Sequence, residues 1–203
     1  MEIRVVDGKD KKEIKRIVSV HMQTFTGFFL TFMGKGFLKQ MYQSYCRHAD
    51  SELLGAYNDE GEIVGFLAWS ANMSGLYKYM IKKKLIPFAW YSMGAFFRKP
   101  RVFMRLIRAF LKPSESAREE AYVELASIGV DPGAKSVGVG SALIDTLKER
   151  VDFSKHAYIA LETDAENNDG VNRFYQKNGF VLERNYTTRE GRAMNEYRWR
   201  PQN

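Results

Sequence analysis

Residues 130–143 read VDPGAKSVGVGSAL, in which a buried strand ends at Val130 and a glycine-punctuated turn opens directly into a helix. This layout directs several backbone N–H groups toward one point, beside the positive end of the helix dipole. Because Gly138 and Gly140 have no Cβ atom, an oxyanion can approach the backbone closely there. Lys135 adds a mobile cation. The stretch therefore predicts a site for a phosphate or pyrophosphate group.

Other interpretations of this stretch are possible from the glycines alone. They also fit an ordinary strand-to-helix turn, in which glycine permits close packing. Two known nucleotide sites are excluded, because the spacing does not match a P-loop and no GxGxxG follows a first strand. Motifs elsewhere in the C-terminal half are needed to distinguish an anion-binding turn from a turn in which glycine only permits packing.

Hydrophobic periodicity and turn signals place strands and helices on both sides of the turn. Before it we expect strands at 3–5, 52–57, 63–70 and 121–130, helices at 10–21 and 35–47, and a loop or short helix at 25–32. After it we expect helices at 141–151 and 168–178, a strand at 157–162, and a hairpin of 180–186 and 194–200. Gly179 is the expected C-cap of the second helix. This order predicts an α/β domain with a mixed sheet.

A second motif, NDGVNRFYQKNGF, occupies residues 168–180. Together with the turn, it resembles the GNAT superfamily of acetyl-CoA-dependent N-acyltransferases. That family has Arg/Gln-x-x-Gly-x-Gly/Ala after Val-x-Pro, and later a helix of the form Asn-x-x-Ala-x-x-Leu/Phe-Tyr-x-x-x-Gly-Phe. The resemblance is firm over residues 120–200 and extends to 1–70 only in the order of elements. The chain departs from the pattern at Lys135, Ser136 and Val171, where the family commonly has Arg or Gln, Gly, and Ala.

The resemblance implies a GNAT-like mixed, mostly antiparallel central β-sheet flanked by helices, in a single domain over residues 1–203. A helical insertion at about 72–118 interrupts it. The implied reaction moves an acetyl group from acetyl-CoA, a co-substrate, to a primary amine. Transfer is direct, through a tetrahedral intermediate, with no covalent acyl-enzyme. The acceptor is open among amino sugar, polyamine, antibiotic, peptide amine and protein lysine, and we expect an amino sugar or other small molecule.

The resemblance also assigns residues. The turn would hold the pyrophosphate, and the pantetheine arm would pair with strand 121–130 as an additional strand. The implied cofactor-binding residues are Ile128, Val130, Lys135, Ser136, Val137, Gly138, Val139, Gly140, Ser141 and Asn168. Tyr175 would lie near the thioester sulfur and protonate the leaving thiolate. The alternative for Tyr175 is a half-buried helix aromatic that flanks Phe174.

A candidate general base lies on the strand before the turn. Strict alternation puts Tyr122, Glu124, Ala126 and Ile128 on one face. Glu124 is an acid in an otherwise apolar strand, where desolvation would raise its pKa, so it could deprotonate the amine directly or through water. An ion pair with a cation on a neighbouring strand is an equally good interpretation. A backbone N–H near Ile128 is expected to polarise the carbonyl.

The net charge of +7 is concentrated in one segment. Residues 72–118 hold eleven Lys and Arg against one acid, Glu115, and carry +10, so the other 156 residues carry −3. Aromatic residues lie among these cations, and residues 101–112 have an amphipathic helical pattern. Three interpretations are open: a cover that binds an anionic acceptor, such as a nucleotide-linked amino sugar; a surface for an anionic membrane; or a packed addition whose basic face meets solvent or a partner subunit.

The composition, the cysteine and histidine content and the lack of targeting signals exclude several classes of protein. The apolar share of 45% and charged share of 27% exclude whole-chain disorder. Cys46 is the only cysteine, and no signal peptide or membrane span is evident, so we expect a cytoplasmic protein, with peripheral membrane attachment left open. The three histidines show no metal-ligand spacing, and no metal is expected.

The non-enzyme alternative is a basic protein that binds nucleic acid or a membrane surface on a catalytically degenerate GNAT fold. Nucleic acid is disfavoured, because no zinc-ligand pattern, helix-turn-helix or RNA-recognition aromatic motif is present. Retention of Asn168, Tyr175 and both turn glycines argues against degeneration. A monomer and a homodimer are both compatible with the sequence.

Overall fold

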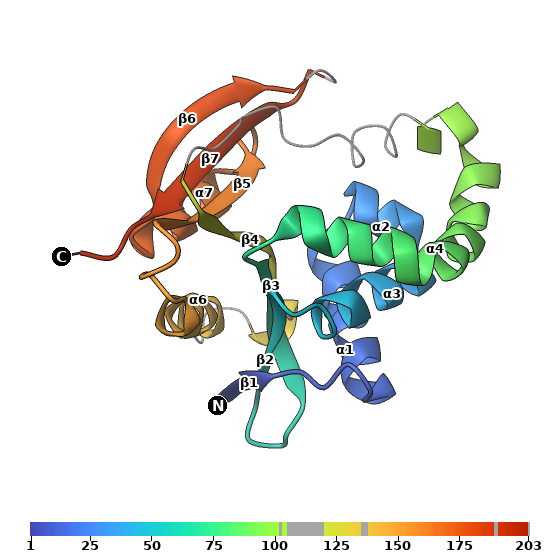
Figure 1. The fold of residues 1–203 in the computed structure, drawn as a ribbon, viewed down its shortest axis with the longest axis horizontal. Coiled ribbons are helices and arrows are strands. Elements are labelled where there is room, and N and C mark those ends of the chain that lie inside the picture. Colours follow the sequence, from blue (N-terminus) through green and yellow to red (C-terminus); the bar gives the residue numbers. More distant parts are fainter. Residues whose placement is uncertain (102, 105–119, 135–137, 189–190, 203) are drawn as a thin grey trace.

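The computed structural model describes residues 1–101, 103–104, 120–134, 138–188 and 191–202. Within these residues one sheet of seven strands has the order β1-β2-β3-β4-β5-β7-β6 (Figure 1). The strands are β1 (Glu2–Val5), β2 (Ser51–Tyr57), β3 (Ile63–Ser70), β4 (Tyr122–Val130), β5 (Tyr158–Asp164), β6 (Val181–Thr187) and β7 (Ala193–Trp199). Neighbouring strands run antiparallel except β4 and β5, which are parallel. The predicted mixed, mostly antiparallel sheet is confirmed.

The helices flank this sheet. They are α1 (Lys11–Thr24), α2 (Phe29–Met33), α3 (Lys35–Tyr45), α4 (Met73–Arg98), α6 (Val139–Arg150) and α7 (Asp169–Lys177), and a 3₁₀ turn, η1, spans Pro132–Ala134. The predicted elements are confirmed to within a few residues at their ends. Most of the helix predicted at 101–112, and residues 189–190 of the final turn, lie outside the described residues.

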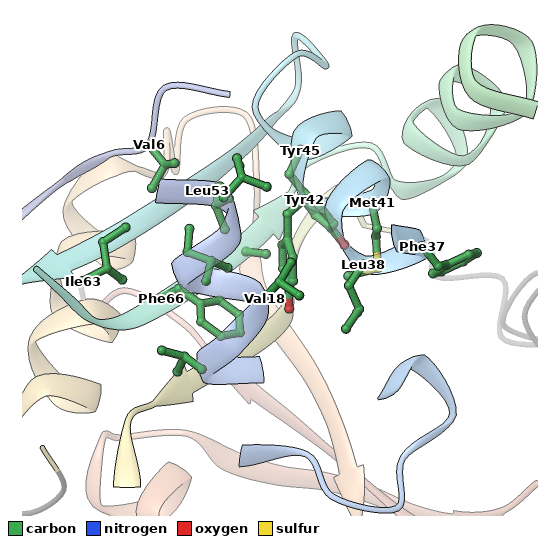
Figure 2. Close-up of a cluster of buried hydrophobic side chains, with 14 of the residues drawn as sticks. Val6, Val18, Phe37, Leu38, Met41, Tyr42, Tyr45, Leu53, Ile63 and Phe66 are labelled. Carbon is green, nitrogen blue, oxygen red and sulfur yellow. The ribbon is translucent and has the colours of Figure 1, made fainter. Parts of the chain in front are cut away.

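Helices α1 to α4 pack on one face of the sheet. Asp10 caps α1 by accepting hydrogen bonds from the N–H groups of Lys12 and Glu13. The apolar positions that follow at helical spacing are then buried. Figure 2 shows Val18 of α1, Tyr42 of α3 and Phe66 of β3 gathered in this cluster. We call it the α1–α4 face.

Helix α6 covers the opposite face, which we call the α6 face. Leu143, Ile144 and Leu147 of α6 are fully buried against apolar side chains of β2 to β5. Tyr175 of α7 belongs to the same cluster. Gly179 ends α7 with a φ of +80°, so the C-terminal glycine predicted from the sequence is confirmed.

Strand β4 changes partners along its length. Tyr122 to Glu124 pair with β5, and Glu124 also pairs with β3, whereas Leu125 and residues 127–130 pair with β3 alone. The register with β3 also shifts, because Ser127 lies opposite Ala68 and Leu125 opposite Trp69, which leaves Ala126 without a partner. Beyond Glu124 the described structure therefore presents a free backbone edge.

The shift at Ala126 corrects one prediction. Strict alternation put Ile128 on the same face as Glu124, but Ile128 packs into the α6 face. Ser127 instead follows Glu124 on the α1–α4 face, where its hydroxyl lies 3.5 Å from that of Tyr42. The prediction was wrong because one extra residue in a strand reverses the alternation after it.

Candidate active site

Contacts made by Asp131 fix the beginning of the turn that precedes α6. Asp131 accepts a hydrogen bond from the N–H of Gly133 at 2.8 Å and pairs with Arg16 at 2.7 Å. Lys135, Ser136 and Val137, which are predicted cofactor residues, lie outside the described residues. The next residue, Gly138, has a φ of +75° that disfavours any side chain.

The first turn of α6 suits an anion. The helix begins at Val139, two residues before the predicted start, and no described side chain caps it. The N–H groups of Val139, Gly140 and Ser141 have no partner within the helix, as at any helix start. The position of a Cβ at Gly138 has no atom within 4 Å. A ligand oxyanion therefore has both donors and access here.

Gly140 has a different local role. A Cβ at this position would lie 3.0 and 3.1 Å from two ring carbons of Phe174. The missing side chain thus lets α7 pack onto the start of α6. Of the two explanations for these glycines, close packing applies at Gly140 and open approach applies at Gly138.

The other predicted cofactor residues lie close to this turn in the chain. Ile128 and Val130 belong to the part of β4 that pairs with β3 alone, and the carbonyl of Val130 accepts a hydrogen bond from the Thr24 hydroxyl at 3.1 Å. Asn168 precedes α7, and its amide nitrogen donates to the Thr163 hydroxyl at 2.8 Å and to the Asp164 carbonyl at 3.1 Å. Asn168 therefore joins the end of β5 to α7.

Tyr175 is buried on the α6 face. Its ring lies near those of Phe174, Phe180 and Tyr197, with centroids 5.4 to 6.1 Å apart. Burial raises the pKa of its phenol well above the ordinary value, so the group is protonated at neutral pH. Its hydroxyl forms no hydrogen bond with any described residue. A neutral phenol in this position is chemically able to donate a proton to a thiolate.

Glu124 pairs with strands on both sides of β4 and lies opposite Ser70 of β3 and Ala160 of β5. It faces α3 and α4. Burial raises the pKa of Tyr77 above its usual range, and the charges of Glu124 and Glu162 raise it further. The Tyr186 hydroxyl donates to Glu162 at 2.7 Å. Glu162 and its neighbours Tyr77 and Tyr186 thus lie near Glu124, the last β4 residue that pairs with β5.

Glu162 and Tyr77 were not predicted as site residues. Glu162 had the same signal as Glu124, an acid in an otherwise apolar strand. Tyr77 had no signal, because the insertion that contains it matches neither family motif.

A buried polar chain supports β4 from the α1–α4 face. Nδ1 of His21 lies 2.7 Å from the Tyr42 hydroxyl, which approaches Ser127 beside the register shift. Desolvation lowers the pKa of His21 to about 4 and raises that of Tyr42, so both are neutral near pH 7. These groups tie α1 and α3 to the strand.

A depression of about 550 Å³ lies between η1 and the β2–β3 turn. Its described cations, the Arg16 guanidinium and the Met1 ammonium, are already paired with Asp131 and Asp59. The remaining charged side chains in its described lining are Glu60 and Glu62. This acidic lining does not suit a pyrophosphate, which leaves the start of α6 as the better anion site. Among the described residues, no group of three or more potential ligands could hold a metal ion.

Comparison with known proteins gives one family and many similar structures. A model of the acetyltransferase (GNAT) family matches residues 16–180. Among solved structures, a protein of Desulfovibrio desulfuricans assigned to that family superposes with a TM-score of 0.62 at 16% identity, covering 98% of both chains. Ard1 from Thermoplasma volcanium gives 0.60 at 16%, covering 100% of this chain and 98% of its own.

A third similar structure contains a ligand. NAA60 from Arabidopsis thaliana, in complex with acetyl-CoA, gives a TM-score of 0.57 at 15% identity and covers 98% of this chain and 97% of its own. At these identities the similarity shows the shared fold alone. No curated protein sequence matches the chain significantly.

Proposed function

The chain belongs to the acetyltransferase (GNAT) family, and from this premise we propose that it moves an acetyl group from acetyl-CoA to a primary amine. One observation carries the proposal. Residues 125–130 of β4, which have no strand partner on the β5 side, lead into a helix start that no described side chain caps. An extended amide-containing arm with a pyrophosphate at one end matches both features.

Acetyl-CoA would be recognised mainly by backbone groups. Its pyrophosphate would accept hydrogen bonds from the turn, residues 135–141, with Lys135 as a counter-charge. Its pantetheine arm would bind the edge of β4 around Ile128 and Val130, and Asn168 would contact the arm from the start of α7. A backbone N–H at the register shift in β4, near Ile128, would polarise the thioester carbonyl.

The chemistry would be direct transfer through a tetrahedral intermediate. Glu124 would take one proton from the ammonium form of the acceptor, directly or through water, and later release it to solvent. The neutral nitrogen would then attack the thioester carbon and form the C–N bond as the carbonyl oxygen becomes an oxyanion. The tetrahedral intermediate would collapse as the C=O bond re-forms and the C–S bond breaks. Tyr175 would donate its proton to the sulfur and regain the proton that the nitrogen loses. The products are an amide and free CoA.

The acceptor would approach from the α1–α4 face. The described side chains there, Glu124, Glu162 and Tyr77, are acidic and aromatic. Carboxylates attract an amine that arrives protonated, and tyrosine rings contact its cationic head. A small-molecule amine, such as an amino sugar, suits this chemistry.

The function is tested by measuring acetyl-CoA binding by calorimetry and thiol release over a panel of amines. Gly138→Ala places a methyl group where the anion would lie, whereas Gly61→Ala introduces the same change at an equally open turn glycine with a φ of +76°. We expect Gly138→Ala to weaken binding by roughly 10- to 100-fold, the value of a hydrogen bond or two to a charged group. Gly61→Ala should bind normally.

Equal binding by the two variants would contradict the turn assignment. If the wild-type protein binds no acetyl-CoA and instead binds DNA or RNA with strong salt dependence, the proposal fails in favour of a binding protein on a degenerate GNAT fold.

A further inference from the structure

The outer side of α4 exposes large apolar side chains. Ile86, Trp90, Met93 and Phe97 are 81%, 68%, 41% and 74% exposed. Their spacing of four, three and four residues places them in one stripe along the helix. A contiguous apolar surface of this kind is unusual on a protein that contacts only water. We call these four residues the α4 stripe.

The inner side of the same helix is firmly packed. Leu76, Met80 and Ala95 are buried in the cluster that includes α1 and α3. Phe88 lies against Phe37 of α3, with ring centroids 4.7 Å apart, and Lys84 donates to Gln40 at 2.9 Å. Figure 1 shows α4 lying along α2 and α3. The α4 stripe is therefore exposed on a helix held in place by its other side.

Cations lie at both ends of the stripe. Exposed Lys78, Lys82 and Lys83 precede it, and exposed Lys99 and Arg101 follow it. The sequence from residue 72 to residue 114 contains no Asp or Glu. Apolar side chains bracketed by lysine and arginine match a bilayer interface, where acyl chains lie beneath anionic headgroups.

A second copy of the chain is a poorer occupant. The stripe is cationic at both ends, so a symmetric pair in either helix orientation brings positive charge against positive charge. Among the described residues no helix is long and apolar enough to cross a membrane. We propose that the α4 stripe and its flanking cations dock the protein on an anionic membrane surface. This proposal does not depend on the acetyltransferase chemistry.

Vesicle co-sedimentation tests the proposal. The wild-type protein should sediment with phosphatidylcholine vesicles that contain phosphatidylglycerol, should not sediment with phosphatidylcholine alone, and should dissociate as salt is raised. Ile86→Ser/Phe97→Ser should weaken binding by more than about tenfold. The control is Val181→Ser/Leu182→Ser, which changes exposed apolar residues on β6 and should bind normally.

The contribution of the flanking cations to vesicle binding is tested separately. Lys82→Gln/Lys83→Gln should weaken binding roughly 30-fold, and Lys11→Gln/Lys12→Gln, which removes the same charge from the start of α1, should not. Trp90 is the exposed one of the three tryptophans, so vesicles should shift its fluorescence to the blue, and Trp90→Phe should abolish the shift.

Three outcomes would overturn the proposal. One is equal binding to both vesicle types. Another is unchanged vesicle binding by the folded Ile86→Ser/Phe97→Ser variant, with folding checked by circular dichroism. The third is a dimer in sedimentation velocity that this variant dissociates, without vesicle binding by the wild type, which would assign the stripe to a second copy.

Discussion

The two faces of the sheet are built from different chemistry. On the α6 face, aliphatic side chains of α6 bury the strands, and the polar groups offered to a ligand are those of the backbone. On the α1–α4 face, the core is rich in tyrosine and phenylalanine, contains the neutral His21–Tyr42 pair, and carries Glu124 toward α4. An anionic cofactor suits the first face and a cationic amine suits the second.

Strand β4 is the element that both faces share. The half that pairs with β5 carries Glu124, and the half that pairs with β3 alone leads to the start of α6. The register shift at Ala126 separates these halves and decides which side chains each face receives. The difference between the faces can be tested residue by residue.

The largest effect is expected at Tyr175. Tyr175→Phe removes the proposed proton donor and should lower turnover about 1000-fold while acetyl-CoA affinity is unchanged. The control is Tyr197→Phe in the same aromatic cluster, whose hydroxyl donates to Asn172 at 3.0 Å. Steady-state kinetics and calorimetry measure both quantities. Turnover equal to that of the wild type would reject the role and leave Tyr175 as a core aromatic.

His21 should make the α1–α4 face sensitive to acid. Desolvation lowers its pKa from 6.5 to about 4, so the unfolded state binds the proton first. Its contribution to stability is fully present above pH 6.5 and is lost as the pH falls toward 4, about 3 kcal/mol in all. Urea unfolding as a function of pH should show this slope, and His21→Gln should flatten it. An unchanged slope would contradict a neutral buried histidine.

A smaller kinetic effect is expected at Glu124. Glu124→Gln should lower kcat/KM about 100-fold and remove the acid limb of the pH–rate profile, because the group that titrates is gone. Glu162→Gln, the nearby carboxylate on β5, should raise KM and keep the limb. If the two variants keep the same limb, Glu124 is a partner in an ion pair and the base lies elsewhere.

The smallest effect concerns packing between α6 and α7. Gly140→Ala presses on Phe174, whereas Gly170→Ala adds a methyl group in α7 where no atom lies within 4 Å. Gly140→Ala should destabilise the protein by about 1 kcal/mol. Gly170→Ala should stabilise it by about 0.5 to 1 kcal/mol. Urea midpoints compare the two, and equal shifts would mean that the ring of Phe174 yields freely.

Periodicity and turn signals were sufficient for nearly every strand and helix, because each buries one face and is bounded by a capping or turn residue such as Asp10 or Gly179. The side-chain faces of β4 were not predictable beyond Leu125. The register shift falls at Ala126, a small residue with no local signal, and strict alternation was assumed to continue. Such a shift is determined by pairing with β3, a long-range contact.

Helix α4 shows a second limit of prediction from the sequence. Pro87 and Gly94 are residues that disfavour a helix interior, yet one helix spans Met73–Arg98. Pro87 removes the hydrogen bond to the carbonyl of Lys83, which is an exposed residue where water can replace it. The packing of Phe88 against Phe37 then holds the helix in place. For the site, the motifs indicated the α6 start and Tyr175. Glu162 had a signal in its strand, whereas Tyr77 required the fold because the insertion that contains it matches neither motif.

Amide hydrogen exchange with and without acetyl-CoA tests the central claim most directly, because it reports backbone groups that gain a partner. We predict that acetyl-CoA slows exchange in residues 125–130 of β4, which have no strand partner on the β5 side, and at the start of α6, residues 139–141. Residues 122–124, whose edge toward β5 is already paired, and the outer turns of α4 should be unaffected. Protection at α4 or at the depression beside η1, with none in β4 and α6, would contradict the account.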